Sequence, residues 1–244
     1  MEIDEYRRMY ELEESHWWYK GLHDLVLGTV RDIFAGRNDL KILDAGCGTG
    51  LALKRLNESG QSFGVDLSDV ALGYCRRRGL ARIYRASIAE LPFGGESFDL
   101  AVSMDVLCSL TPPDEKTAYR EIQRVLKKEG YLVLNLPAHD YLKRGQDRNA
   151  HVRHRYSIEE ARRKLSDSGF DIIKIGYRNA FSFPIIFISK FVINKFYKER
   201  YTELGAVWPG LNAFLYGMLR LENIMLKKIN MPFGMSIFCI ARKR

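Results

Sequence analysis

The sequence predicts an α/β fold in which a doubly wound, mostly parallel sheet of seven strands lies between two layers of helices. Two observations lead to this class. Apolar, strand-like runs alternate with helix-like segments through residues 38–178, a rhythm typical of parallel strands joined by helices. The first strand also runs directly into three glycines at alternate positions, Gly46, Gly48 and Gly50, which indicates a tight strand-to-helix turn.

Each element follows from a local signal. Residues 1–37 give two helical pieces rich in aromatic side chains, and residues 51–58 form a helix after the glycines. Ser68 suits the N-cap of a helix over residues 69–78, and a capping box at Ser157 opens a helix that ends at Gly169. Another helix covers residues 114–127 and is expected to stop at Gly130. The expected strands cover residues 41–44, 62–66, 81–86, 98–104, 131–136, 171–177 and 235–241.

These elements divide the chain into four parts. Residues 1–37 form an N-terminal helical cap, and residues 38–178 form the ligand-binding core. Residues 179–232 form a helical, apolar insertion, and residues 233–244 supply the final strand of the core. The insertion is expected to be helical because a structureless loop of about fifty residues is uncommon inside a compact domain.

Composition limits the class of protein. With 244 residues, 46% of them hydrophobic, the chain can form one large domain with a packed core. Its four widely spaced cysteines fit neither a zinc site nor a disulfide framework, which favours a reducing compartment. The acidic N-terminus is unlike a secretory signal, so we expect a cytoplasmic protein. The net charge of +8 comes from short, scattered basic clusters, which fit solvated helix faces or attraction to nucleic acid, anionic lipid or a phosphorylated substrate.

The glycine turn indicates the kind of ligand. Its spacing is G-x-G-x-G, and Leu51 stands where a dinucleotide-binding fingerprint has its third glycine. The Gly-Lys-Ser/Thr ending of a phosphate-binding P-loop is also missing from this segment. Asp66 ends the second strand, and an acid at this point contacts the ribose in doubly wound folds. The segment therefore predicts a nucleoside ligand that has no pyrophosphate.

At this point the sequence resembles the class I S-adenosylmethionine (SAM)-dependent methyltransferases. Residues 44–50, Asp-Ala-Gly-Cys-Gly-Thr-Gly, are similar to the first motif of that family. Residues 90–99 and 120–130 resemble its segments before the fourth and fifth strands. The resemblance implies a Rossmann-like sheet whose last strand is antiparallel, with SAM as cofactor, S-adenosylhomocysteine as product and no metal.

The resemblance also implies which residues hold the cofactor. The glycines would admit the methionine part and the ribose, Asp66 would accept hydrogen bonds from the ribose hydroxyls, and Asp105 would lie near the amino group. The full set of expected cofactor-binding residues is Asp44, Gly46, Cys47, Gly48, Gly50, Asp66, Leu67, Ser87, Ile88 and Asp105.

Two positions depart from the family pattern. Many relatives place an Asp after the third strand, where it contacts the adenine amino group, whereas this chain has Ser87 there. Many relatives also read Glu-His-Leu after the fourth strand, whereas residues 108–110 of this chain read Cys-Ser-Leu. A histidine base is therefore not expected at that position.

A narrower resemblance concerns the acceptor. Residues 16–19, His-Trp-Trp-Tyr, are similar to a motif of one branch of bacterial and archaeal methyltransferases, and residues 151–156 resemble a His-x-Arg-x-Tyr element of that branch. The catalytic candidates are His16, His151 and Tyr156, and the acceptor-binding candidates are Trp17, Trp18, Tyr19, His139 and Arg153. Packing of the tryptophans and a solvated cationic loop at His151 are the plainer alternatives, and His23 is expected on the helix surface.

The insertion has three competing uses. Residues 181–193 are strongly apolar but shorter than the roughly 20 residues that span a bilayer. Lys190 lies near the end of this run, and Lys195 and Lys198 follow it. The insertion would cap an apolar substrate, touch a membrane surface as a peripheral protein, or form the face of a homodimer.

Three functions follow from these observations. The first is methylation of a small molecule, such as a metabolite, a lipid-like molecule or a sugar, by in-line displacement. The second is RNA methylation, which the basic charge favours, although the sequence has no recognisable appended RNA-binding module, so nucleic acid is not the expected partner. The third is a non-enzymatic SAM-binding or scaffold protein, since fold does not imply function.

Overall fold

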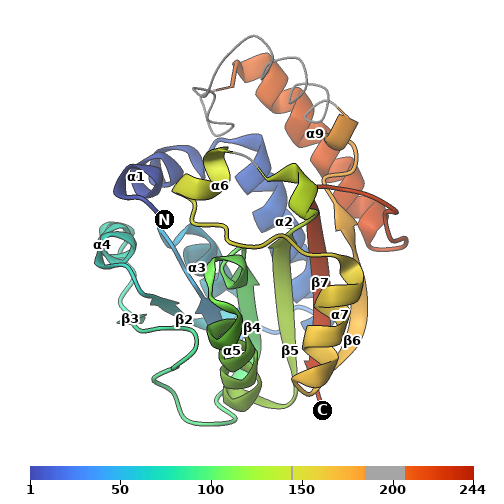
Figure 1. Ribbon diagram of the computed structural model, residues 1–244. Coiled ribbons are helices and arrows are strands. Elements are labelled where there is room, and N and C mark those ends of the chain that lie inside the picture. The colour runs from blue at the N-terminus through green and yellow to red at the C-terminus, as the bar shows by residue number, and fades with distance from the viewer. Residues whose placement is uncertain (144, 185–206) are drawn as a thin grey trace.

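The computed structural model describes residues 1–143, 145–184 and 207–244. Its centre is a seven-stranded sheet of order β3-β2-β1-β4-β5-β7-β6 (Figure 1). Strand β7 is antiparallel to β5 and β6, and the remaining neighbours are parallel. The strands are β1 (Leu40–Ala45), β2 (Gly60–Asp66), β3 (Ile83–Arg85), β4 (Phe98–Met104), β5 (Leu126–Pro137), β6 (Phe170–Arg178) and β7 (Ser236–Lys243). The predicted fold class is confirmed.

Helices cover both faces of this sheet, so its central strands are buried on both sides. Helices α5 (Pro112–Val125) and α7 (Ile158–Asp167) pack on one face through Ile122 and Leu165, which are fully buried. Helix α2 (Trp17–Phe34) packs on the other face through Leu22 and Val26. The shorter helices are α1 (Ile3–Leu12), α3 (Leu51–Leu56), α4 (Asp69–Arg77) and α6 (Gly145–Asn149), with 3-10 turns η1 (Asn57–Ser59), η2 (Leu107–Ser109) and η3 (Asp140–Leu142).

Helix α9 (Pro209–Leu226) belongs to the expected insertion and packs along α2. Gly21 of α2 makes this approach possible, because a Cβ there would lie 2.4 Å from Leu219 Cδ1. Asn223 adds a hydrogen bond from Nδ2 to the carbonyl oxygen of Gly21, at 2.8 Å. Two segments about 200 residues apart in the sequence therefore lie side by side.

The part of the insertion that was expected to be strongly apolar falls mostly outside the described residues. The apolar run over residues 181–193 is described only as far as residue 184, and Lys190, Lys195 and Lys198 lie outside the described residues. Within the described ranges, no helix is long and apolar enough to cross a membrane.

The boundaries differ most from the prediction where α5 ends and β5 begins. The helix expected over residues 114–127 starts earlier, at Pro112, and ends at Val125. Leu126 is fully buried and pairs with Phe98 of β4, so strand pairing of this apolar residue overrides the local helix signal. The turn that sequence patterns place at Gly130 is made instead with Glu129 in the left-handed region, at φ 60°.

Candidate functional site

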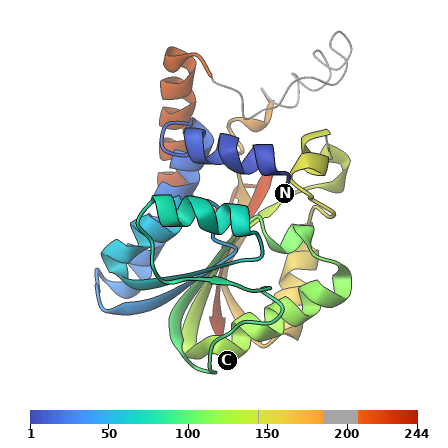
Figure 2. The ribbon, with the colours of Figure 1, turned by 90° about the vertical axis from the view of Figure 1, so that its left-hand side faces the viewer.

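A cavity of about 1050 Å³ lies at the carboxyl ends of β1, β2 and β4. Helix α1 crosses above these strand ends and lines the cavity from outside (Figure 2). One end, here called the glycine-loop side, is formed by residues 44–48, 66–68 and 86–88. The other, here called the α9 side, is formed by residues 16–19, 22–23, 150–155, 179, 182, 207–208, 211, 215 and 235–236.

Backbone geometry fixes the glycine loop. The N–H groups of Gly46 and Cys47 both donate to the carbonyl oxygen of Val65, which ties the loop to β2. Gly46 has φ 99°, and a Cβ there would lie 2.2 Å from Val106 Cγ2. At Gly48, by contrast, a Cβ would meet only the end of the Met9 side chain, so the loop leaves room for a ligand on that side. Gly50 begins α3 and does not line the cavity.

Asp66 holds the loop from the end of β2. Its carboxylate accepts hydrogen bonds from the N–H groups of Gly48 and Ser68, at 3.0 and 2.9 Å. Burial raises its pKa, while these backbone hydrogen bonds lower it. Each carboxylate oxygen can accept a further hydrogen bond, so Asp66 can also receive hydroxyl groups from the cavity.

Asp44 is a buried carboxylate that lines the cavity. It is 1% exposed, and neither of its carboxylate oxygens has a hydrogen-bond donor among the described residues. Burial, followed by the charges of Asp66 and Glu13, raises its pKa to about 7. Unpaired buried carboxylate oxygens are costly, so this position suits a cationic or hydrogen-bond-donating group of a ligand.

The remaining residues of this side offer apolar surfaces. Leu67 is 65% exposed and Ile88 is 5% exposed, and both line the cavity. Ser87 also lines it, with its Oγ accepting from the N–H of Ala89 at 3.1 Å. Cys47 lies under the loop, and its Sγ is 3.9 Å from Cys75 Sγ, so two cysteines distant in sequence meet in the core.

His16 begins α2, and its contacts define its chemistry. Its Nδ1 accepts a hydrogen bond from the N–H of Trp18 at 3.3 Å, so in the neutral ring the proton sits on Nε2. Burial lowers its pKa to about 4, which keeps the ring neutral near pH 7. Nε2 is buried without a partner among the described residues. His16 therefore presents a hydrogen-bond donor to the α9 side, and this arrangement does not make it a base.

The aromatic residues after His16 line the cavity while also packing. Trp17 is 8% exposed and contacts Leu215 and Leu219 of α9. The ring of Trp18 lies edge-on to that of Tyr19, with centroids 5.0 Å apart. Packing and cavity lining are thus combined in the same side chains.

His151 and Arg153 line the cavity and are exposed. His151 is half-exposed, with Nδ1 2.9 Å from the amino group of Met1 and Nε2 3.0 Å from a carboxylate oxygen of Glu2. Arg153 donates from Nε to the carbonyl oxygen of Ser109 at 3.1 Å. Both ring nitrogens of His151 are therefore occupied, while Arg153 is fixed at the cavity mouth.

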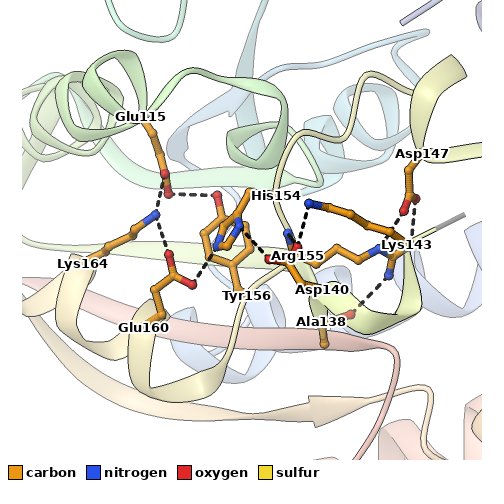
Figure 3. Close-up of polar contacts among 10 residues, drawn as sticks. All are labelled: Glu115, Ala138, Asp140, Lys143, Asp147, His154, Arg155, Tyr156, Glu160 and Lys164. Carbon is orange, nitrogen blue, oxygen red and sulfur yellow. Dashed lines mark hydrogen bonds and ion pairs between the residues drawn. The ribbon is translucent and has the colours of Figure 1, made fainter.

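Tyr156 is not brought to the cavity. It is 1% exposed, and its hydroxyl donates to Glu115 of α5 at 2.9 Å (Figure 3). Lys164 of α7 also contacts Glu115, at 2.6 Å. Tyr156 forms a bridge with Ala138 at the end of β5, which directs its side chain into the core beneath α5 and α7. This position does not support the predicted catalytic role.

His139 also lies away from the cavity lining. Its ring stacks on Tyr177 with centroids 4.8 Å apart and lies near Tyr141 at 5.0 Å. Arg155, which the sequence analysis passed over, does line the cavity and forms a bidentate ion pair with Asp147 (Figure 3).

His23 was expected on the helix surface, and that expectation is wrong. It is 4% exposed, lines the α9 side, and has an Nδ1 without a partner among the described residues. Burial lowers its pKa to about 3. The sequence signal was spacing: His23 lies one helical turn after Tyr19, on the face of α2 that continues the aromatic motif.

Asn179 is a second residue that pattern reading missed. It directly follows β6, is 2% exposed and lines the cavity, and its Oδ1 is unpaired among the described residues. Its N–H donates to Glu222 of α9, which also accepts from the N–H of Phe181 at 3.1 Å. Only the packing of α9 reveals this site, because its residues are far apart in sequence.

Known proteins resemble this chain mainly in its core. Residues 43–134 match the methyltransferase domain family. A Mycobacterium tuberculosis protein, named as a probable S-adenosylmethionine-dependent methyltransferase, is 27% identical over 168 residues, covering 67% of this chain and 59% of that protein. The malonyl-[acyl-carrier protein] O-methyltransferase of Erwinia pyrifoliae is 37% identical over 105 residues, covering 40% of this chain and 37% of its own length. The chain thus spans less than two thirds of these relatives.

Solved structures support the same fold. An S-adenosylmethionine-dependent methyltransferase from Mesorhizobium loti superposes with a TM-score of 0.59 at 20% identity, covering 88% of this chain and 96% of that one. None of these similarities concerns the His-Trp-Trp-Tyr branch, which stays a prediction. The sheet order, the antiparallel β7 and the glycine loop agree with the match of residues 43–134, and together they identify this part of the chain as a class I S-adenosylmethionine-dependent methyltransferase domain.

Proposed function

We propose that this protein transfers a methyl group from SAM to a small-molecule acceptor bound at the α9 side of the cavity. The observation that carries the proposal is one continuous cavity with two different ends. The glycine-loop side offers carboxylates and backbone, whereas the α9 side offers aromatic and aliphatic walls. Its volume of about 1050 Å³ is large for one small ligand and suits two molecules held together.

Residues of the glycine-loop side fit the cofactor. The unpaired oxygens of Asp44 suit its amino group, and Asp66 suits the ribose hydroxyls. Leu67 and Ile88 present apolar surface for the adenine, and Ser87 supplies a polar edge without charge. When bound, SAM supplies a methyl group on a positively charged sulfur, whose departure needs no acid.

Residues of the α9 side fit an apolar acceptor. Its walls include Trp17, Trp18, Leu22, Trp208, Leu211 and Leu215. Such walls exclude water and hold the attacking atom in line with the methyl group. Positioning of two reactants can lower a barrier by ~7–11 kcal/mol, so it is the main contribution that these side chains make. The relatives reported above are named as methyltransferases, which supports methyl transfer by this protein. Their acceptors are not carried over to it.

Calorimetric titration with S-adenosylhomocysteine tests the cofactor half of the proposal. We expect the wild-type protein to bind it and Asp66→Ala to weaken binding by about 10–100-fold, because hydrogen bonds to a charged group contribute ~1.5–3 kcal/mol each. Trp208→Ala is the matched control, since Trp208 is 75% exposed and lies on the α9 side. Its affinity should equal that of the wild type. A wild-type protein that binds no S-adenosylhomocysteine would contradict the proposal.

Transfer from tritium-labelled SAM tests the acceptor half. A metabolite extract and a total RNA fraction are incubated separately with the protein. We expect label in small organic-extractable products. Label in nuclease-sensitive RNA would instead support the RNA alternative, and no transfer to either would support the scaffold alternative.

A further inference from the structure

We propose that Asp105 contacts the acceptor rather than the cofactor and takes a proton from its attacking atom, so that the acceptor carries a hydroxyl or another weakly acidic X–H group. This inference rests on the proposed function and assigns the substrate class of the same cavity. The sequence resemblance places Asp105 beside the amino group of the cofactor, but its surroundings differ from those of Asp44 in three ways.

The first difference is hydrogen bonding. Asp44 and Asp105 follow the neighbouring strands β1 and β4, and both line the cavity. Both oxygens of Asp44 lack a donor among the described residues, whereas both oxygens of Asp105 lie 2.9 Å from Asn135 Nδ2. A buried carboxylate without a partner suits an ammonium group, and Asp44 can meet the cofactor amino group without help from Asp105.

The second difference is the electrostatic surroundings. Asp66 and Glu13 act on Asp44; Asp66 belongs to the glycine-loop side, and Glu13 accepts a hydrogen bond from Thr49, which follows the loop. Arg178 and Arg155 act on Asp105, and they lie at the end of β6 and in the loop before α7. Asp105 therefore belongs electrostatically to the β5–β6 half of the sheet, where the α9 side is built.

The third difference is a chain of buried groups that orients Asp105. Arg178, which is 0% exposed, donates from Nη1 to Asn135 Oδ1 at 3.3 Å. Because arginine can only donate, this contact fixes the oxygen of the Asn135 amide toward Arg178 and its nitrogen toward Asp105. Asn135 is also 0% exposed, so Asn135 and Arg178 act as positioning residues for one carboxylate at the cavity wall.

The other candidate bases of this cavity end are engaged or weak. His23 has an Nδ1 without a partner among the described residues, but burial lowers its pKa to about 3, so its ring is a weaker base than Asp105. His16 presents an N–H donor, His151 has both nitrogens engaged, and Tyr156 lies in the core below α5. Asp147 is held by Arg155 in a bidentate ion pair. Asp105 alone among these groups combines a free lone pair, a fixed orientation and a place between the two ends.

Its acid–base properties suit the step. Burial raises the pKa of Asp105 to about 6, while Asn135, Arg178 and Arg155 act to lower it. Tyr19 of α2 and Cys108 of η2 are the other titratable groups facing it, and burial raises the pKa of each. A carboxylate with this pKa is ionised above about pH 6 and is a stronger base than an ordinary aspartate.

The step balances without another reactant. The attacking atom of the acceptor forms a bond to the methyl carbon as the carbon–sulfur bond breaks, and that electron pair stays on sulfur. The proton of the attacking atom passes to an Asp105 oxygen and from there to water. The sulfur leaves as a neutral thioether, so no second proton is needed.

Two ligands distinguish the role of Asp44 from that of Asp105. S-adenosylhomocysteine has the amino acid part, whereas 5′-methylthioadenosine lacks it. We expect the wild type to prefer the first by about 10-fold or more, which corresponds to ~1.4 kcal/mol. Asp44→Asn should lose most of this preference, and Asp105→Asn should keep it within about 3-fold. Equal losses in both variants would overturn the inference, while a wild type that binds neither ligand would overturn the proposed function instead.

Label transfer into the metabolite extract supplies the second readout. We expect Asp105→Asn to reduce transfer by about 100-fold or more while its S-adenosylhomocysteine affinity is kept, because general-base catalysis contributes roughly 10²–10⁴-fold. Asp171→Asn is the control, since Asp171 is an exposed residue at the start of β6 paired with Arg244. Unchanged transfer in Asp105→Asn would overturn the inference.

Discussion

The two ends of the cavity are built in different ways. The glycine-loop side comes from a short stretch of chain, residues 44–88, and much of its geometry is backbone. The α9 side comes from residues 16–23, 150–155, 179–182, 207–215 and 235–236, which meet only when α9 packs on α2. The glycine-loop side is therefore specified locally, whereas the α9 side is specified by tertiary packing.

Their polar atoms differ as well. Asp66 is satisfied by two backbone N–H groups even without a ligand. At the α9 side, His16 Nε2, His23 Nδ1 and Asn179 Oδ1 are buried without partners among the described residues. Such groups are costly unless water or a ligand meets them, so this end is prepared for a polar group on an otherwise apolar molecule.

The largest effect should come from the glycine loop. Gly46→Ala places a Cβ 2.2 Å from Val106 Cγ2 at a φ of 99°, so the loop must move. We expect S-adenosylhomocysteine affinity to fall by more than about 100-fold and the free energy of unfolding to fall by ~2–4 kcal/mol. Calorimetry and urea unfolding measure these changes.

Gly73→Ala is the control for that variant. Gly73 lies in α4, and a Cβ added there would have nothing within 4 Å, so alanine should be neutral or stabilising by about 0.5–1 kcal/mol. If Gly46→Ala behaved like Gly73→Ala, the loop would not be specified by its backbone.

The next effect separates stability from cofactor binding. Trp17→Ala removes a buried side chain that joins α2 to α9, and large-to-small changes of this kind cost ~3–5 kcal/mol. We expect a loss near the lower end of this range, with S-adenosylhomocysteine affinity within about 3-fold of the wild type. Trp208→Ala, at an exposed residue, should change stability by less than about 0.5 kcal/mol. A large loss of cofactor affinity in Trp17→Ala would show that the two ends are not independent.

A smaller effect concerns pH. The pKa of Asp44 is raised in the folded state to about 7, so the folded state binds more protons than the unfolded state between about pH 4 and pH 7. Deprotonation of Asp44 therefore lowers the free energy of unfolding as pH rises through that window. Asp44→Asn should remove it and stabilise the ligand-free protein at pH 8 by about 1–2 kcal/mol. Urea midpoints of both proteins at pH 5 and pH 8 check the sign, and a variant less stable at pH 8 would contradict it.

The smallest effect is a shift in a pH profile. Asn135→Ala removes a hydrogen bond that lowers the pKa of Asp105. The acidic limb of the label-transfer rate should therefore move to higher pH by about one unit, while the preference for S-adenosylhomocysteine stays unchanged. A purely structural role for Asn135 would lower the rate at every pH without moving the limb.

Sequence reasoning reached the fold and the glycine loop because both depend on local signals. Strand alternation, the cap at Ser68 and the acid at Asp66 are each confirmed as elements of the structure. It missed the end of α5, where pairing of buried Leu126 with β4 overrides a helix signal. It also missed His23 and the burial of Tyr156, since both depend on which face of an element another segment covers.

The structure of the protein bound to S-adenosylhomocysteine tests the central claim most directly. We expect the amino group of S-adenosylhomocysteine to lie at Asp44 and its ribose at Asp66. Its sulfur should face Asp105 across open space toward the α9 side. A sulfur walled off from Trp18 and Asp105, or a ligand whose amino group contacts Asp105 instead of Asp44, would contradict it.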